Sequence, residues 1–342
     1  MRHIETIIVG GGPAGATCAR ELQRRGREVA VIDKTTFPRQ KLCAGWVTEK
    51  ALQDLELTPE TYPHPMLEMD IRSNVRGLPF TLSWFPTPGP NFSIRRYEFD
   101  AFLLERSGAE VIEHSVKSIR REGDLYVIDD QFTCRNLVGA GGTMCPVRRQ
   151  VFDEERRKTK QIATLEVEFE YPSRRDDCRL YFFQRGLMGY AWFVPKGDGF
   201  VNIGIGGKSN YFRRSETNIH DHFKSFIEDL VKEGRIDAAT AEGIKAKGHP
   251  YFLLSDDGAV KQDNCYLIGD SAGLASADLG EGIGPAVESG QMAAREIMGE
   301  GVYDKARVTA YSFSGAIKFV LETLAKRRRA RRARRAEAAA AA

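Results

Sequence analysis

The N-terminal part of the chain alternates between apolar runs and a segment with helical periodicity. Residues 4–34 read IETIIVGGGPAGATCARELQRRGREVAVIDK, in which the apolar runs IIV and VAVI flank the helical segment. Two short apolar strands joined through a helix are typical of a βαβ unit, whose parallel strands are buried on both faces. The pattern therefore predicts a parallel sheet that begins near the N-terminus.

The middle of the chain has a different pattern. Residues 165–171, LEVEFEY, alternate apolar and acidic positions, which is typical of a half-buried strand. The apolar segments 180–183, 190–196 and 200–206 follow, with turn residues between them. This spacing predicts an antiparallel sheet of hairpins, and we expect the strand-like segment 66–85 to join the same sheet.

Helical patterns at 216–232 and 237–247 are expected to cover this second sheet, and an amphipathic helix is expected from about residue 303. The predicted fold class is α/β, with a Rossmann-like βαβ domain that binds a cofactor and an inserted substrate domain built on an antiparallel sheet. The predicted limits are 1–64, 93–160 and 255–300 for the cofactor domain, 65–92 and 161–254 for the substrate domain, and 301–342 for a C-terminal helix and basic tail.

Composition indicates an ordinary soluble protein. The chain has 342 residues, of which 42% are hydrophobic and 28% charged. No apolar run approaches the roughly 18 residues that a membrane-spanning helix needs, and a strand follows the N-terminus too closely for a signal peptide. The six cysteines are scattered without a CxxC pair, and the histidines show no metal-ligand spacing. We expect a cytoplasmic protein with reduced thiols and no metal site.

Charge is concentrated at the C-terminal end. The net charge is +3, but residues 326–335, KRRRARRARR, carry eight basic side chains. This run is consistent with a solvated tail or with a peripheral contact to an anionic membrane surface. A nucleic-acid patch would have the same composition, but nothing else in the sequence supports it, so we expect no nucleic-acid partner.

The turn between the first two predicted strands carries a glycine motif with the spacing Gly10-x-Gly12-x-x-Gly15. The first glycine permits a tight turn, the second lets the backbone approach a pyrophosphate, and the third lets the helix pack closely on the strand. The helix N-terminus would offer free N–H groups to the phosphates, and Asp33 would accept hydrogen bonds from a ribose. The predicted cofactor contacts in this unit are Gly10, Gly12, Pro13, Ala14, Gly15, Asp33 and Lys34.

A second glycine-rich segment distinguishes FAD from NAD. The apolar run CYLI ends at Gly269 and Asp270, and a loop leads into a small-residue helix from about Gly282. An acid at this strand end can bind the ribitol of an extended FAD, and the helix N-terminus can face the pyrimidine edge of the flavin, where reduction develops negative charge. A strand–turn–helix with a capping aspartate has the same local pattern, but an NAD domain has no use for this second element. We therefore predict FAD, with contacts at Gly269, Asp270, Gly282 and Ile283.

From residue 1 to nearly residue 300 the chain resembles the FAD-dependent oxidoreductases of the para-hydroxybenzoate hydroxylase fold group, and within it the geranylgeranyl reductase family. GGGPAG, IGDSAG and the RYEFD stretch at 96–100 are similar to motifs of the wider group. FPRQKLCAGWV (37–47) resembles the family's Arg-x-Lys-x-Cys-Gly stretch, although Ala44 precedes the glycine. YAWFVPK (190–196) resembles its Tyr-x-Trp-x-Phe-Pro element, with Val194 in place of the phenylalanine. The resemblance implies further FAD contacts at Arg39, Cys43, Ala44 and Arg96.

Alternation in YAWFVPK places Tyr190 and Trp192 on one face of a strand that Pro195 ends or borders. The spacing alone is consistent with an aromatic pair in a sheet core or with the wall of an apolar pocket. The resemblance favours the wall and implies that reduced FAD donates hydride to a carbon–carbon double bond of a prenyl lipid. A proton is also needed, from Cys43, Tyr190 or water, although Cys43 is equally typical of a small buried residue. The predicted catalytic residues are Cys43, Tyr190 and Trp192.

Two other functions are consistent with the same motifs. A flavin monooxygenase or halogenase would act through a C4a-oxygen adduct, but Tyr190 stands where halogenases carry the first tryptophan of a Trp-x-Trp-x-Ile-Pro element. A flavoprotein that only relays electrons is the other alternative.

The stretch LVGAGGTMCPVRR (137–149) resembles the wider group's Gly-Ala-Asp-Gly-x-x-Ser-x-Val-Arg element, but Gly141 replaces the aspartate and Cys145 the serine. In the hydroxylases that aspartate is tied to both the FAD pyrophosphate and the use of NAD(P)H. Gly141 can still bring backbone N–H groups near phosphate, and Arg148 can supply charge. We therefore expect tight FAD binding, poor direct reduction by NADPH, and electrons from a ferredoxin-like or other protein donor.

Overall fold

The computed structural model describes residues 1–75, 81–82, 89–152, 161–172, 177–214, 217–254, 258–277 and 279–309. Parts of the segment expected as strand at 66–85 lie outside these ranges. The basic tail and all but the first residues of the helix expected from residue 303 also lie outside them. Within them, residues 305–307 form a single 3₁₀ turn.

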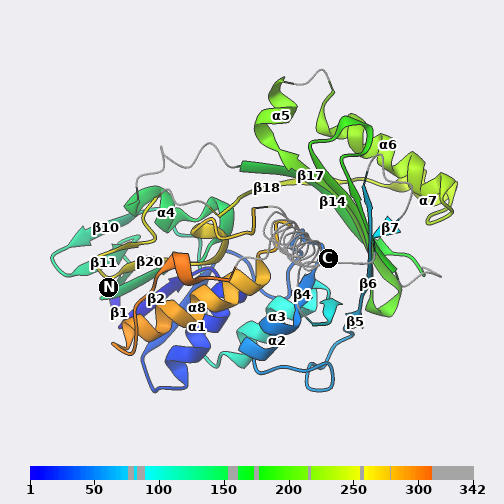
Figure 1. Cartoon of the computed structure of the whole chain (residues 1–342). Helices are drawn as coiled ribbons and strands as arrows, with labels where there is room; N and C mark the ends of the chain where they lie inside the picture. Colours follow the sequence, from blue (N-terminus) through cyan, green and yellow to red (C-terminus); the bar gives the residue numbers. More distant parts are fainter. Residues whose placement is uncertain are drawn as a thin grey trace, which may run out of the picture.

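A six-stranded sheet begins at the N-terminus, as the apolar runs predict (Figure 1). Its strands are parallel except for β19 at one edge. Helix α1 (Pro13–Gln23) connects β2 to β3 and completes the βαβ unit. In spatial order the strands are β19 (Lys261–Gln262), β20 (Cys265–Leu267), β13 (Asn136–Gly139), β2 (Thr6–Val9), β3 (Val29–Asp33) and β9 (Glu110–Glu113).

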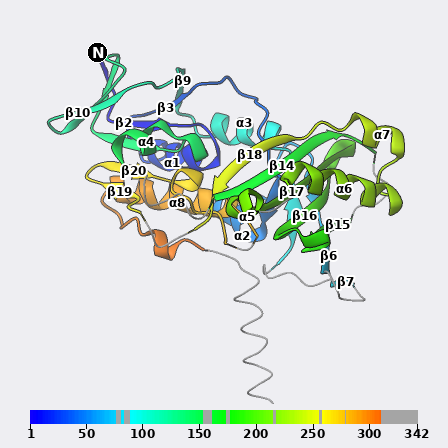
Figure 2. The same cartoon turned by 90° about the horizontal axis from the view of Figure 1, so that it is seen from above.

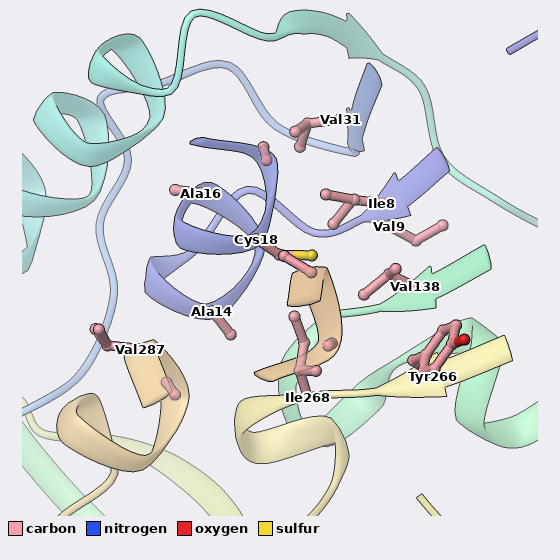
Figure 3. Close-up of a cluster of buried hydrophobic side chains, with 14 of the residues drawn as sticks. Ile8, Val9, Ala14, Ala16, Cys18, Val31, Val138, Tyr266, Ile268 and Val287 are labelled. Carbon is pink, nitrogen blue, oxygen red and sulfur yellow. The ribbon is translucent and has the colours of Figure 1, made fainter. Parts of the chain in front are cut away.

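The core of this part is built from strand residues on one side and small helix residues on the other. Figure 3 shows Ile8, Val31 and Val138 facing the helices α1 and α8 (Ile283–Ile297). The two helices approach so closely that a Cβ on Gly290 would lie 2.5 Å from the Ala14 carbonyl oxygen. The alanines and glycines of both helices therefore set how near the second glycine-rich segment lies to the first.

A seven-stranded sheet forms the second part of the molecule, at the upper right of Figure 1. Its neighbouring strands are antiparallel except for β15 and β6, which are parallel. The strands in spatial order are β18 (Lys247–Phe252), β14 (Gln161–Glu170), β17 (Phe200–Lys208), β16 (Gly189–Lys196), β15 (Asp177–Phe182), β6 (Asp70–Val75) and β7 (Thr81–Leu82).

Helices cover the outer face of this sheet (Figure 2). The aromatic residues Phe223 and Phe226 of these helices pack against strand residues such as Ile203. Asn218 caps the longest of these helices through a capping box with Asp221. The covering helices are α5 (Ser209–Arg214), α6 (Ile219–Lys232) and α7 (Ala238–Gly243).

Two smaller sheets and short helices complete the described structure. The four-stranded sheet contains β1 (Arg2–His3), β12 (Phe132–Cys134), β11 (Leu125–Ile128) and β10 (Ile119–Glu122). The three-stranded sheet contains β4 (Trp46–Thr48), β8 (Asn91–Ser93) and β5 (Leu67–Glu68). The other helices are α2 (Glu49–Asp54), α3 (Arg96–Arg106), α4 (Pro146–Val151), and the 3₁₀ turns η1 (Gly142–Met144), η3 (Gln184–Gly186), η4 (Gly197–Gly199), η5 (Gly269–Ser271) and η6 (Lys305–Arg307).

The α/β class with a Rossmann-like domain is confirmed, and three details differ from the expectation. The helix predicted at 237–247 ends at Gly243, because Lys247 begins β18 and pairs with Glu166. Leu67–Glu68 pairs with β8 in the three-stranded sheet and not with the seven-stranded sheet. Strand β16 continues past Pro195 to Lys196. The domain limits stay a prediction.

Candidate active site

The loop between β2 and α1 has the geometry of a phosphate-binding turn. Gly10 has φ +115°, and its N–H donates to Ile32 at 2.8 Å, which closes the turn against β3. A Cβ on Gly15 would overlap the Gly10 carbonyl oxygen, so only glycine permits this helix–strand contact. Near Gly12, the Nη2 of Arg39 lies 3.5 Å from where a Cβ would be. A phosphate at the N-terminus of α1, where Pro13 and Ala14 begin the helix, would therefore meet both N–H groups and a cation.

Asp33 orders this loop through both carboxylate oxygens. Its Oδ2 accepts the Gly11 N–H at 2.8 Å, and its Oδ1 accepts the N–H and hydroxyl of Thr35 at 3.1 and 2.9 Å. Each carboxylate oxygen has more than one lone pair, so ribose hydroxyls can still be accepted. The Lys34 side chain, next along the chain, is exposed.

A buried group of two cations and one anion lies beside the glycine loop. Arg96, at the start of α3, binds Asp100 through two hydrogen bonds of 2.5 and 2.8 Å, and Arg39 approaches the same carboxylate at 3.3 Å. Burial alone would lower the pKa of Arg96, but the Asp100 carboxylate, together with Cys43, outweighs it and raises that pKa. Burial lowers the pKa of Arg39 in spite of Asp100. The group carries an excess positive charge, which favours an anionic ligand.

The second glycine-rich segment brings Asp270 to the N-terminus of α8. Gly269 has φ +58° and donates its N–H to the Ser289 hydroxyl at 3.0 Å, which fixes η5 against α8. The Oδ1 of Asp270 lies 3.4 Å from where a Cβ on Gly282 would be. The acid and the start of the helix, with Gly282 and Ile283, are thus side by side as the FAD prediction requires.

Glu281 precedes this helix and was not predicted. Its Oε1 accepts the Gly284 N–H at 2.7 Å, and its Oε2 has no hydrogen-bond partner among the described residues. Burial raises the pKa of Glu281 to about 7. An acid inside a glycine-rich loop is the sequence signal that would have found it.

Tyr190 and Trp192 lie on the inner face of the seven-stranded sheet with ring centroids 5.6 Å apart. The Trp192 indole covers Gly204 of β17, where a Cβ would overlap the indole Cζ2. The Tyr190 hydroxyl donates a hydrogen bond to the Leu279 carbonyl oxygen, so the sheet contacts the loop that precedes α8. Burial raises the pKa of Tyr190 well above its usual value. Glycines inside β17 are the sequence signal for this close approach.

Cys43 belongs to a loop held between the two large sheets. Its carbonyl oxygen accepts hydrogen bonds from Asn202 Nδ2 at 3.3 Å and from Lys196 Nζ at 3.4 Å. Trp192 Nε1 in turn donates to Asn202 Oδ1 at 2.6 Å. Cys43 packs against the core of the six-stranded sheet, whereas Ala44 packs against the hydrophobic cluster that contains Trp192. The loop therefore joins the two parts of the molecule.

The Cys43 sulfur accepts the Gly45 N–H at 3.3 Å and also lies within hydrogen-bonding reach of Arg96. Asn202 hydrogen-bonds both the Cys43 carbonyl oxygen and the Trp192 indole, and the Trp192 ring lies beside that of Tyr190. The structure thus brings together the predicted catalytic residues Cys43, Tyr190 and Trp192. Their catalytic roles stay a prediction.

Lys41 and His249 form a second link across the same space. Lys41 Nζ lies 2.9 Å from His249 Nε2, which joins the Cys43 loop to β18. Burial, reinforced by the Lys41 charge, lowers the pKa of His249 to about 4, so this imidazole is neutral at pH 7. The pKa of Lys41 is also lowered, because burial outweighs the opposing effect of the Asp270 carboxylate. Neither residue was predicted as part of the site.

The strand predicted at 165–171 is confirmed by β14, but its acidic positions are not all on a solvated face, because Glu170 is exposed whereas Glu166 is buried and Glu168 is partly buried. Glu166 is only 4% exposed, and burial raises its pKa to about 7. Glu168 pairs with Lys196 at 2.6 Å and with Arg95 at 3.2 Å. Glu166 and Glu168 face the part of the molecule that contains the six-stranded sheet, because the opposite face of β14 packs under the helices. Alternation identifies two faces of a strand but not what covers each.

Gly141 lies in a confined position. A Cβ there would lie 3.2 Å from Cys145 Cα and 3.3 Å from Pro146 Cδ, so an aspartate would require these neighbours to move. Arg148 is buried, donates to the Thr143 carbonyl oxygen and stacks on Phe252 at 4.7 Å. No group of metal-ligating side chains occurs among the described residues, and none of the helices in the described ranges is long and apolar enough to cross a membrane.

Comparisons with known proteins agree with this geometry. A model of the NAD(P)-binding Rossmann-like domain matches residues 8–57. Digeranylgeranylglycerophospholipid reductase 3 of Methanosphaera stadtmanae is 29% identical over 86% of this chain and 77% of its own length. An uncharacterized protein of Methanosarcina barkeri is 31% identical over 89% and 78%. Menaquinone reductase of Mycolicibacterium smegmatis is 29% identical over 88% and 78%.

Solved structures share the fold at lower identity. A geranylgeranyl bacteriochlorophyll reductase-like protein of Thermoplasma acidophilum has a TM-score of 0.69 and 19% identity, over 96% of this chain and 84% of its own. The flavin-dependent brominase Bmp2 has a TM-score of 0.68 and 18% identity, over 86% and 78%. From the fold and from the relatives that cover most of its length, this chain is an enzyme that belongs to the geranylgeranyl reductase family of FAD-dependent oxidoreductases.

Proposed function

We propose that the protein is a FAD-dependent reductase that saturates carbon–carbon double bonds of a prenyl lipid. The observation that carries this proposal is the Cys43 loop, which Asn202 and Lys196 hold against the aromatic face of the seven-stranded sheet. The reactive group of a cofactor bound between this loop and the six-stranded sheet would lie near Tyr190 and Trp192. The aromatic side chains of these two residues suit an apolar chain as substrate. Relatives named as digeranylgeranylglycerophospholipid reductases and menaquinone reductases support a prenylated substrate.

The residues fit FAD. The turn at Gly10, Gly12 and Gly15 with the Arg39–Arg96–Asp100 group suits its pyrophosphate, and Asp33 beside Lys34 suits its ribose. Asp270 suits the ribitol, while the N-terminus of α8 suits the pyrimidine edge. When bound and reduced, FAD would supply a hydride. The chain's own residues would then orient the lipid, exclude water and provide a proton.

Tyr190 serves in this proposal as a wall and not as the acid. Its hydroxyl proton is already donated to the Leu279 carbonyl oxygen, and burial raises its pKa, which makes proton release harder. Trp192, fixed by Asn202 and supported by Gly204, would form the adjoining wall. An isolated alkene offers little for a protein to polarise, so shape and exclusion of water are the contributions that these side chains can make.

The electron source in this proposal is a ferredoxin-like protein donor. Support comes from Gly141, whose surroundings leave little room for the aspartate associated with NAD(P)H use in the hydroxylases. We expect slow reduction of the bound flavin by NADPH in a stopped-flow trace and fast reduction by a reduced ferredoxin. Rapid stoichiometric reduction by NADPH would contradict this assignment of the donor.

Anaerobic single turnover tests the reaction itself. Dithionite-reduced holoprotein is mixed with a geranylgeranylated lipid, and flavin absorbance is followed while the lipid is analysed by mass spectrometry. The proposal predicts flavin reoxidation without oxygen and a lipid heavier by two hydrogens per turnover. If turnover requires oxygen and yields a hydroxylated or halogenated product, the monooxygenase or halogenase alternative is correct.

A further inference from the structure

We propose that Glu166 is the acid that supplies the proton for double-bond reduction. This assignment rests on the proposed reductase function and deepens it. Glu166 lies at the middle of β14, on the inner face of the seven-stranded sheet, and its strand is flanked by β17 and β18.

The position of Glu166 places its carboxyl group beside the aromatic wall and the Cys43 loop. A Cβ on Gly204 would contact both the Trp192 indole and the Glu166 Cβ, the latter at 2.8 Å, so these two side chains lie over the same glycine. Glu166 Oε2 accepts a hydrogen bond from Asn202 Nδ2 at 3.3 Å, and the same amide donates to the Cys43 carbonyl oxygen. The Asn202 side chain therefore links the Glu166 carboxyl group to the Cys43 loop.

Other ionisable groups nearby are less able to give a proton. Lys196 Nζ directs its donors to Glu168, the Ile94 carbonyl and the Cys43 carbonyl at 2.6, 2.9 and 3.4 Å, which uses all three N–H bonds. Tyr190 donates to Leu279, and burial raises the pKa of both Tyr190 and Tyr251 far above neutrality. Cys43 and Lys41 remain as competitors near Glu166, with Glu281 at the start of α8, and a separate variant tests Cys43.

Burial raises the pKa of Glu166 to about 7, and Asn202, Lys196 and Lys41 limit that rise. A large fraction of the carboxyl group is therefore protonated at neutral pH, as a general acid requires. The charged and titratable groups that face it are Lys196 and Tyr190 on β16, Lys41 on the Cys43 loop, Glu168 on its own strand, and Lys247, His249 and Tyr251 on β18, where Lys247 is its cross-strand partner.

Glu166 donates its O–H proton to one alkene carbon, where the new C–H bond forms as the π bond breaks. Bound reduced FAD would supply the hydride for the other carbon, so that the two electrons gained by the lipid would be the two lost by the cofactor. The Glu166 carboxylate that remains is stabilised by the Asn202 amide and the two lysines, and it regains a proton from solvent.

The test compares Glu166→Gln with Glu170→Gln, which lies on the same face of the same strand but is exposed. In anaerobic single turnover with geranylgeranylated lipid, Glu166→Gln should slow flavin reoxidation by about 100-fold or more, whereas Glu170→Gln should match the wild type. Glu166→Asp should retain part of the rate, and the wild-type rate should fall above about pH 7. Cys43→Ala should not abolish the pH dependence.

Infrared spectroscopy of the oxidised holoprotein gives an independent measurement. The wild type should show carboxylic acid absorbance that disappears with a midpoint near pH 7 and that comes from Glu166 and Glu281, and Glu166→Gln should lose the Glu166 share while Glu281→Gln retains it. If folded, flavin-loaded Glu166→Gln turns over at the wild-type rate, or if its infrared titration is unchanged, the role of Glu166 is wrong while the reductase function stands. Absence of any lipid-dependent reoxidation in the wild type would overturn the reductase function instead.

Discussion

Glu281 provides a direct test of burial at the start of α8. Its side chain is 9% exposed, and one of its oxygens has no hydrogen-bond partner among the described residues. Burial raises the pKa of Glu281 from 4.5 to about 7, with Glu288 adding to the rise and the Gly284 N–H and Lys50 opposing it. This difference corresponds to about 3 kcal/mol, since one pKa unit is worth about 1.4 kcal/mol.

The sign of the effect follows from proton binding. Between about pH 4.5 and 7 the folded protein keeps the Glu281 proton while the unfolded chain has released it. The free energy of unfolding therefore falls as pH rises through this window, and the full penalty is present above about pH 7. Glu281→Gln removes the ionisation and keeps an oxygen for the Gly284 N–H. The variant should gain stability relative to the wild type by about 2–3 kcal/mol between pH 5 and pH 8.

Urea unfolding of the holoprotein at fixed excess FAD, followed by tryptophan fluorescence, measures this gain. Glu166 contributes a similar pH dependence to both proteins, so it cancels in the difference. Glu300→Gln, at a side chain that is 46% exposed, serves as the control and should show no such gain. If wild type and Glu281→Gln lose stability in parallel across this pH range, the carboxyl group is hydrated and the burial argument is wrong.

Two other substitutions test the packing of the site. Asp100→Asn leaves Arg96 and Arg39 buried without their carboxylate and should destabilise the protein by about 3–5 kcal/mol in urea unfolding; a loss below about 1 kcal/mol would show that water reaches the pair. Gly204→Ala places a methyl group against the Trp192 indole and should cost about 1–3 kcal/mol. It should also shift the tryptophan fluorescence, and an unchanged spectrum would contradict the contact.

The geometry of the glycine loop after β2 could be predicted because its constraints are local. The glycines at 10, 12 and 15 act through backbone geometry, and Asp33 follows them at the end of the adjacent strand. Such features depend on a single βαβ unit, so a short stretch of sequence contains them. The alternation of Tyr190 and Trp192 likewise predicted their shared face.

The polar groups of the seven-stranded sheet could not be predicted in the same way. Glu166, Lys196, Asn202 and His249 come from four different strands, and each would be an ordinary surface residue if its face met solvent. Their burial depends on which part of the chain covers that face, and period-two alternation contains no such information. Glycines in the interior of β17 were the one local signal of close approach.

These buried polar contacts converge on a single short loop, and this explains why they are polar. Cys43 receives hydrogen bonds from Asn202 and Lys196 of the seven-stranded sheet and faces Arg96 on the other side. Apolar contacts alone would allow the two sheets to slide past each other, whereas an unsatisfied buried lysine or carboxyl group is costly. The pairing of Lys196 with Glu168 and with the loop carbonyl therefore permits few relative positions. Loss of these contacts should alter the distance between the cofactor loops and the aromatic wall before it unfolds either sheet.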